Sequence, residues 1–317
     1  MHSFADAKLL QEIDERRLIK SCGSADALCA IANDYPYQQE LMRDEWGAIK
    51  WYGDDVGGKL VIFKAGNPHL PKTGKRKGND TLSDEEHEKI RLQNSLSRTK
   101  RNVYELAACN PWEWFFTGTL DGEKVDRNDL NGTFKKLSQW MRDYRKRQTG
   151  EKLAYLIVPE EHKKGGWHFH GLLHGLTADE MHQFTASEDI PARIKAAIID
   201  GTPVWTWTAY ARRFGYSTVT AIKSKAAVSA YVTKYITKDM VQEHRAGDTG
   251  QHLYYCSQGL KKAATAAEGT ITKSYLPDCD FENDYLMIRN IKTAEERNAI
   301  AERYGLKWQT EQYTNYV

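Results

Sequence analysis

The chain has 317 residues, of which 40% are hydrophobic and 28% are charged, and its net charge is only +2. This length allows one large domain or two small ones, and the charge excludes a global basic field, so lysines and arginines that bind nucleic acid must be clustered. The charged N-terminus and the short apolar runs exclude a signal peptide and a membrane span. Five cysteines, an odd number without zinc-ligand spacing, predict reduced thiols in a cytosolic protein.

The first third of the chain carries no motif of known chemistry. Residues 1–66 are predicted to form a mainly helical accessory region with a short strand at 59–64. Residues 67–109 are predicted to form a basic loop followed by a helix from residue 84 to 109. Two interpretations of the loop stay open, a solvated linker and a contact to the DNA backbone. The loop cations that would make this contact are Lys72, Lys75, Arg76 and Lys77.

A second domain is expected over residues 110–262. It opens with a strand at 112–120, and apolar residues spaced by three and four then predict an amphipathic helix. That helix ends in a basic cluster, as helix C-termini favour, and its candidate DNA contacts are Arg142, Arg145 and Arg147. Residues 153–158 form the next apolar strand, and the Gly165-Gly166 turn leads into another, so we expect an antiparallel pair.

The end of this domain and the C-terminal region give weaker signals. Residues 201–216 are rich in aromatic side chains with Arg212 and Arg213 interleaved. Packing against a sheet is the favoured interpretation, and a base-stacking platform with DNA-binding arginines is the alternative. Residues 263–317 are predicted to be a tail with one helix at 293–304.

Two histidines form the first candidate site. His168 and His170 are two apart in an apolar run, so on a strand both imidazoles project from one face about 7 Å apart, within reach of one metal ion. Candidates for a third ligand are Glu160, Glu161 and His162. His174 shares the face but lies ~13 Å from His170, and we interpret it as structural.

Two tyrosines form the second candidate site. Tyr231 and Tyr235 are four apart and share one face of a predicted helix, and each is followed three residues later by a lysine, Lys234 and Lys238. A His-x-His pair is common in strands, and tyrosines at this spacing more often belong to a core. The combination of a metal pair with two phenols and their lysines instead indicates phosphodiester chemistry.

These residues resemble a known family. The run E-x7-H-F-H-G-L-L, followed by Y-V-T-K-Y-I-T-K, resembles the HUH endonucleases of rolling-circle replication, above all the two-tyrosine initiators of phages and plasmids such as the phage gene A protein group. Residues 115–120 are similar to the family's first motif, usually Phe-x-Thr-Leu-Thr, from which Gly118 departs. The resemblance covers roughly residues 110–262.

The resemblance implies both a fold and an activity. The fold is α+β, a central antiparallel sheet of about five strands with helices packed on it, the HUH or RNA-recognition-like fold. Glu160 becomes the third ligand of Mn²⁺ or Mg²⁺, and Tyr231, Tyr235, Lys234 and Lys238 become catalytic. The activity is that of a metal-dependent DNA nicking-joining endonuclease, a nucleotidyltransferase, which cuts single-stranded or hairpin DNA at a replication origin. It leaves a 5′-phosphotyrosine link and a free 3′ hydroxyl, and later rejoins the strand.

The expected setting is the cytoplasm of a bacterial host cell. Since the sequence has no Walker motif, a helicase as well as a polymerase would come from the host. Two alternatives remain: a two-tyrosine rolling-circle transposase, and a sequence-specific DNA-binding regulator without catalytic activity.

Overall fold

The computed structural model describes residues 44–64, 83–161, 165–236, 252–272, 278–283, 286–310 and 313–315. The chain divides into two compact units. The first unit combines residues 1–109 with residues 261–316, and the second comprises residues 110–260, inserted between the two parts of the first. Within the described ranges, no helix has the length and apolar character needed to cross a membrane.

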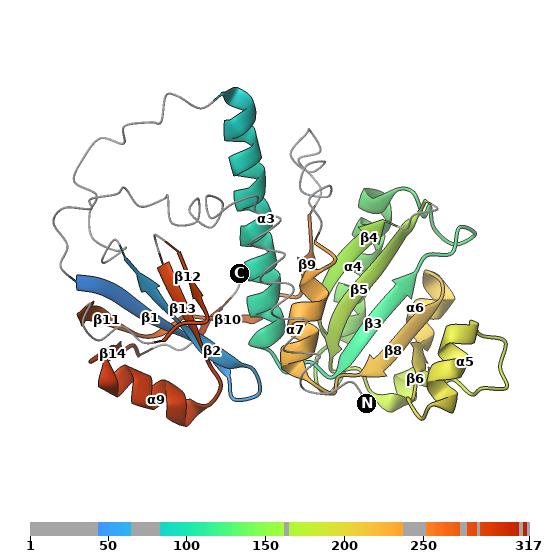
Figure 1. The fold of residues 1–317 in the computed structure, drawn as a ribbon. Coiled ribbons are helices and arrows are strands. Elements are labelled where there is room, and N and C mark those ends of the chain that lie inside the picture. The colour runs from blue at the N-terminus through green and yellow to red at the C-terminus, as the bar shows by residue number, and fades with distance from the viewer. Residues whose placement is uncertain are drawn as a thin grey trace. The chain divides into compact units, whose positions relative to one another are not determined.

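The first unit is built on a six-stranded sheet in which every neighbouring pair is antiparallel (Figure 1). The strand order is β12-β13-β2-β1-β11-β14. A separate pair joins β10 (Lys261–Ala263) to β15 (Tyr313–Asn315). The sheet strands are β1 (Asp44–Gly53), β2 (Gly57–Phe63), β11 (Thr265–Thr272), β12 (Phe281–Glu282), β13 (Leu286–Ile291) and β14 (Lys307–Trp308).

This sheet differs from the expectation for both ends of the chain. Strand β2 confirms the short strand expected at 59–64, whereas β1 lies in a part of the region 1–66 that was expected to be helical, and the first 43 residues are outside the described ranges. Region 263–317, expected to be a tail, supplies four strands of the sheet as well as the expected helix, α9 (Ala294–Arg303). The pairing forms because Ile49, Ile271 and Ile300 share one buried apolar cluster.

Helix α3 (Asp84–Ala108) confirms the predicted helix. Ser83 caps its N-terminus in a reciprocal capping box with Glu86. Near its C-terminal end, Glu105 is only 3% exposed, and its carboxylate accepts a hydrogen bond from the Lys50 ammonium of β1 at 2.8 Å. Because an unpaired buried carboxylate is costly, this ion pair fixes the register of α3 against β1.

The second unit contains the candidate site and is built on a seven-stranded antiparallel sheet (Figure 1). The α+β fold with a central antiparallel sheet is confirmed, with seven strands where about five were expected. The additional strands are short elements at the sheet edges. In spatial order the strands are β6 (Met181–Gln183), β7 (Trp205–Trp207), β8 (Ser217–Ala221), β3 (Trp114–Thr119), β5 (Trp167–His174), β4 (Ala154–Glu161) and β9 (Tyr255–Cys256).

One face of this sheet carries the main apolar core. Helix α4 (Leu130–Arg147), capped by Asp129, confirms the predicted amphipathic helix, and it packs on Phe116 of β3 and Phe169 of β5. Helix α6 (Thr208–Arg213) joins the same core. The aromatic segment is part of that core, which confirms the packing interpretation for its fully buried rings and excludes them as an exposed stacking platform. These rings belong to Trp207, Tyr210 and Phe214.

The opposite face is covered by α7 (Lys225–Thr233), whose N-terminus is capped by the side chain of Ser224. Val232 and Ile236 are fully buried. The helix ends at Thr233, before the second tyrosine. The chain continues as a tighter turn, in which the amide of Ile236 donates to the carbonyl of Thr233 at 3.1 Å. Tyr231 therefore lies in the last turn of the helix, and Tyr235 lies in the tighter turn that follows it.

Two smaller helices complete the unit, α5 (Ala192–Ile199) and the 3₁₀ turn η1 (Ala178–Glu180). A capping box is present between Thr177 and Glu180. It opens a single 3₁₀ turn, because the chain enters β6 at Met181 and pairs there with β7.

The absence of a side chain at Gly118 has a physical reason in the core. A Cβ atom at this position would lie 2.5 Å from the Tyr210 hydroxyl and 2.7 Å from Cζ of Phe116. The rings of Tyr210 and Phe116 therefore occupy the space that a side chain at position 118 would need. Gly118→Ala should cost about 1–3 kcal/mol of folding free energy through overpacking. Thermal unfolding checks this, and Gly150→Ala is the control, since nothing lies within 4 Å of its Cβ. Equal melting temperatures for the two variants would contradict the account.

Candidate active site

The site is centred on β5 and its neighbour β4. These strands form the predicted antiparallel pair, with Glu160 directly opposite His168. Phe169 points into the core shared with α4, so the alternation of a strand places His168 and His170 on the opposite face, toward α7. The predicted common face of the two histidines is confirmed.

Strand β3 supports both imidazoles from the other side. Thr117 lies opposite His170, and Thr119 lies opposite His168. The Thr117 hydroxyl is 3.2 Å from Nδ1 of His170, and the Thr119 hydroxyl is 3.3 Å from Nδ1 of His168. These threonines were not among the predicted site residues. The sequence did contain a signal for them. In an antiparallel pair, a Thr-x-Thr strand can place each of its threonines opposite one histidine of a His-x-His strand.

Glu160 is adjacent to the histidines. Its Oε2 is 2.8 Å from Nε2 of His170, and its side chain is 45% exposed. Burial lowers the pKa of the His170 imidazole below its ordinary value, and the contact with Glu160 offsets part of this shift. Glu161 is exposed at the end of β4, while His162 lies outside the described ranges.

The candidate metal ligands are His168, His170 and Glu160. Within the described ranges, no three His, Cys, Asp or Glu side chains are already grouped as they would be around an ion. Neighbouring ligand atoms of an octahedral Mg²⁺ at 2.0–2.1 Å would lie about 3 Å apart, close to the 2.8 Å between Glu160 Oε2 and His170 Nε2. Nitrogen and carboxylate ligands of this kind suit Mn²⁺ or Mg²⁺. Glu160 and His170 are therefore spaced as two ligands of one divalent cation would be.

The two tyrosines meet over these histidines. The Tyr235 hydroxyl donates a hydrogen bond to the Tyr231 hydroxyl at 3.0 Å. The Tyr235 ring stacks on the His170 imidazole, with centroids 3.8 Å apart and an interplanar angle of 5°. The Tyr231 ring meets Phe115 of β3 edge to face at 5.5 Å. Histidines, carboxylate and phenols thus share one face of the sheet.

Lys234 is the only one of the two predicted lysines within the described ranges, because Lys238 lies outside them. Its Nζ is 3.4 Å from the ring centroid of Tyr231 and 4.8 Å from that of Tyr235. Burial opposes ionisation of Tyr231, yet hydrogen bonds from Lys234 and Tyr235, with the lysine charge, lower the pKa of this phenol below its ordinary value. Burial and the hydrogen bond donated to Tyr231 raise the pKa of Tyr235.

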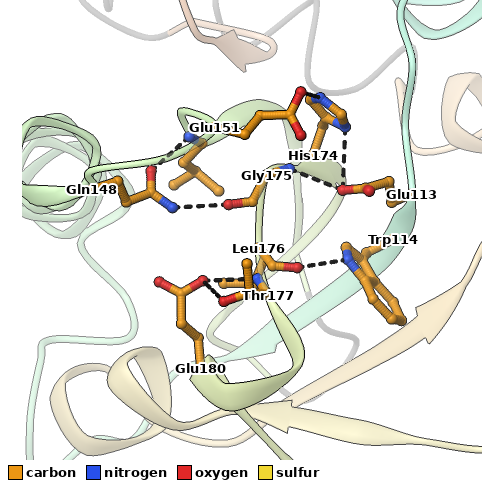
Figure 2. A network of polar contacts seen from close by, with 10 residues as sticks. Glu113, Trp114, Gln148, Glu151, His174, Gly175, Leu176, Thr177 and Glu180 are labelled. Atoms are coloured by element: carbon orange, nitrogen blue, oxygen red, sulfur yellow. Dashed lines mark hydrogen bonds and ion pairs between the residues drawn. The ribbon is translucent and has the colours of Figure 1, made fainter.

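His174 has a different environment, shown in Figure 2. Its Nε2 is 2.7 Å from a carboxylate oxygen of Glu151, and its Nδ1 is 3.2 Å from one of Glu113. Glu113 also accepts a hydrogen bond from the amide of Gly175 at 2.9 Å. These contacts tie the end of β5 to neighbouring segments, which agrees with the structural interpretation of His174.

The predicted DNA-binding residues are not gathered at this site. Arg142 and Arg147 are exposed on α4, on the sheet face opposite the histidines, and Arg145 donates to the carbonyl of Leu153 at 3.1 Å. Arg212 and Arg213 are exposed at the end of α6, which packs into the core on the α4 side. The loop cations lie outside the described ranges and comprise Lys72, Lys75, Arg76 and Lys77.

Comparison with known proteins gives one match. Residues 113–240 match the model of a family described as replication-associated protein ORF2. The matched span contains β3, β4, β5 and α7, and therefore the threonines, the histidines, Glu160 and both tyrosines. No curated protein and no solved structure matches the chain significantly. The match supports a function in the initiation of rolling-circle replication.

Proposed function

We propose that the protein is a rolling-circle replication initiator that nicks single-stranded origin DNA by tyrosine attack and later rejoins it. The observation that carries the proposal is the convergence of His168, His170 and Glu160 with two phenols on one sheet face. The family match over the same residues supports it. The sheet would then be the HUH type suggested by the motifs.

Three side chains would hold the divalent metal, His168 and His170 through Nε2 and Glu160 through its carboxylate. A bound Mn²⁺ or Mg²⁺ would polarise the scissile phosphate as a Lewis acid. The contacts from Thr117 and Thr119 support this assignment, because a histidine whose Nδ1 is held by a neighbour presents Nε2 as the ligand atom. The lowered pKa of His170 favours the neutral imidazole that metal binding requires.

The tyrosines supply the nucleophile. A phenol oxygen attacks the phosphorus and loses its proton, the bond from phosphorus to the 3′ oxygen breaks, and that oxygen takes up a proton. The products are a 5′-phosphotyrosine and a free 3′ hydroxyl. Because the new ester retains the energy of the broken one, the reverse attack by a 3′ hydroxyl rejoins the strand without ATP. The Lys234 ammonium contributes positive charge beside the Tyr231 ring.

Two tyrosines allow two successive cuts. One phenol holds the first 5′ end while a polymerase extends the 3′ hydroxyl, and the other cuts again after a full circle. The host would supply that polymerase and a helicase.

A substrate comparison tests the proposed function. We expect nicking, in Mn²⁺, of single-stranded and hairpin DNA from the protein's own replicon, with at least about tenfold less on the relaxed duplex, where a regular backbone must be opened first. Binding should weaken steeply with salt, as phosphate contacts require. Binding without any nick on any of these substrates would instead indicate a non-catalytic regulator. Nicking confined to the ends of a mobile element, with none at an origin, would indicate a transposase.

A further inference from the structure

The two phenols of the site differ in their access to solvent. The Tyr231 side chain is 43% exposed, whereas Tyr235 is 5% exposed. The difference arises because α7 ends at Thr233, so Tyr231 is in its last turn and Tyr235 is in the tighter turn that follows. A DNA phosphate that approaches this face meets Tyr231 first.

Tyr235 is held in place by two contacts. Its ring lies parallel to the His170 imidazole at 3.8 Å, and its hydroxyl donates to the oxygen of Tyr231 at 3.0 Å. Movement of Tyr235 toward a phosphate would break this hydrogen bond and expose a buried ring, both of which cost free energy. In this arrangement Tyr235 is a donor to Tyr231.

Tyr231 receives the stabilisation that a nucleophilic phenolate needs. The Lys234 ammonium lies 3.4 Å from its ring centroid, and the Tyr235 hydroxyl points at its oxygen. A donated hydrogen bond and a nearby cation both favour the charged form of a phenol. The pKa of Tyr231 is lowered accordingly, despite partial burial of the ring.

We propose that Tyr231 is the nucleophile of the first cleavage, and that Tyr235 stabilises its phenolate by hydrogen bonding and becomes the nucleophile of the second. This inference rests on the proposed nicking function. In the first step the Tyr231 oxygen bonds to phosphorus, its proton leaves to solvent, and the departing 3′ oxygen takes a proton from water. The esterified oxygen of Tyr231 is then uncharged and a weaker acceptor. The Tyr235 hydroxyl thereby loses its charged partner and is released for the second cut.

Adduct mapping in single-turnover reactions of the whole chain tests the order. With single-stranded origin DNA and Mn²⁺, wild-type adducts at early times should lie on Tyr231. Tyr231→Phe should slow the first cut roughly 100-fold or more, as loss of a nucleophile does. Tyr235→Phe should retain the Tyr231 adduct at a roughly tenfold lower rate, the value of one hydrogen bond to a charged group, and should lose the second cut. Tyr216→Phe, which alters a partly buried phenol of the same unit outside the site, is the matched control.

Early adducts on Tyr235, or an equal division between the tyrosines, would overturn the order while leaving the nicking function intact. The absence of an adduct on either tyrosine of the wild type would remove the nicking function itself.

A second readout needs no cleavage. Ultraviolet titration of the DNA-free protein should show one phenol that ionises below the ordinary range, absent in Tyr231→Phe. In Tyr235→Phe the same phenol should titrate at higher pH, because the phenolate loses a donor and its charged form is disfavoured. The pH profile of the first cut should move upward with it. An unchanged titration in both variants would contradict the donor role of Tyr235.

Discussion

His168→Ala and His170→Ala should each abolish both binding of Mn²⁺ and DNA cleavage. Each change removes one of the two imidazoles that the sheet presents on the face covered by α7. A Lewis acid at a phosphate contributes several kcal/mol to the reaction, so the expected loss of rate is on the order of 1,000-fold. Single-turnover cleavage and calorimetric titration with Mn²⁺ measure the two effects, and excess chelator should reproduce the first in the wild type.

The chain offers a matched control on the same strand. His174 lies on the same face of β5, but Glu113 and Glu151 engage it. His174→Ala should therefore keep metal affinity and cleavage, with a loss of stability only. Cleavage by His168→Ala at the wild-type rate, or undiminished cleavage in chelator, would exclude the metal assignment.

Removal of a threonine hydroxyl should have a graded effect. Thr117→Val and Thr119→Val keep side-chain size, but each removes the hydroxyl next to Nδ1 of one histidine. Loss of a supporting contact of this kind weakens metal binding about 10–100-fold. Serine at either position should restore most of the affinity. Thr218→Val, beside Thr117 on β8, is the control.

Removal of both phenol hydroxyls should have the second large effect on DNA cleavage. Tyr231→Phe/Tyr235→Phe should form no covalent DNA adduct and no nick, because both candidate nucleophiles are lost while the metal ligands remain. Affinity for Mn²⁺ and for single-stranded DNA should stay within about twofold of wild type, since neither hydroxyl is a proposed metal ligand and the bond to phosphorus forms only during the reaction. Gel analysis after denaturation measures the adduct. Substantial nicking by the double variant would mean that water or another side chain attacks the phosphate.

The sequence predicted the parts of the site that depend on local periodicity. Two-residue alternation placed His168 and His170 on one face, and the Gly165-Gly166 turn predicted the pairing that brings Glu160 opposite His168. Helical periodicity also predicted α4.

Features that depend on distant segments were not predictable. The support of His170 by Thr117 depends on the register of β3 against β5, across 53 residues of sequence. The close packing at Gly118 involves Tyr210, which a helix far along the chain brings into the core. The pairing of β1 with β11 likewise spans the whole inserted unit. Local patterns carry no information about such contacts.

The unequal environments of the tyrosines were not predictable from the sequence either. A regular helix from Ser224 through Lys238 would have given both phenols similar surroundings, and the spacing of four favoured it. The end of α7 at Thr233 places Tyr235 on His170 and leaves Tyr231 exposed.

The central claim is that a tyrosine attacks the scissile phosphate. The chemical groups at the two DNA ends of the nick test this claim most directly. The whole chain is incubated in Mn²⁺ with origin single strands labelled at either end, and the products are denatured and treated with a polymerase and template. Tyrosine attack predicts that the 3′-side fragment stays covalently bound to protein through its 5′ phosphate, while the 5′-side fragment ends in a 3′ hydroxyl that the polymerase extends. Two protein-free fragments, one with a free 5′ phosphate, would show hydrolysis instead and would contradict the account.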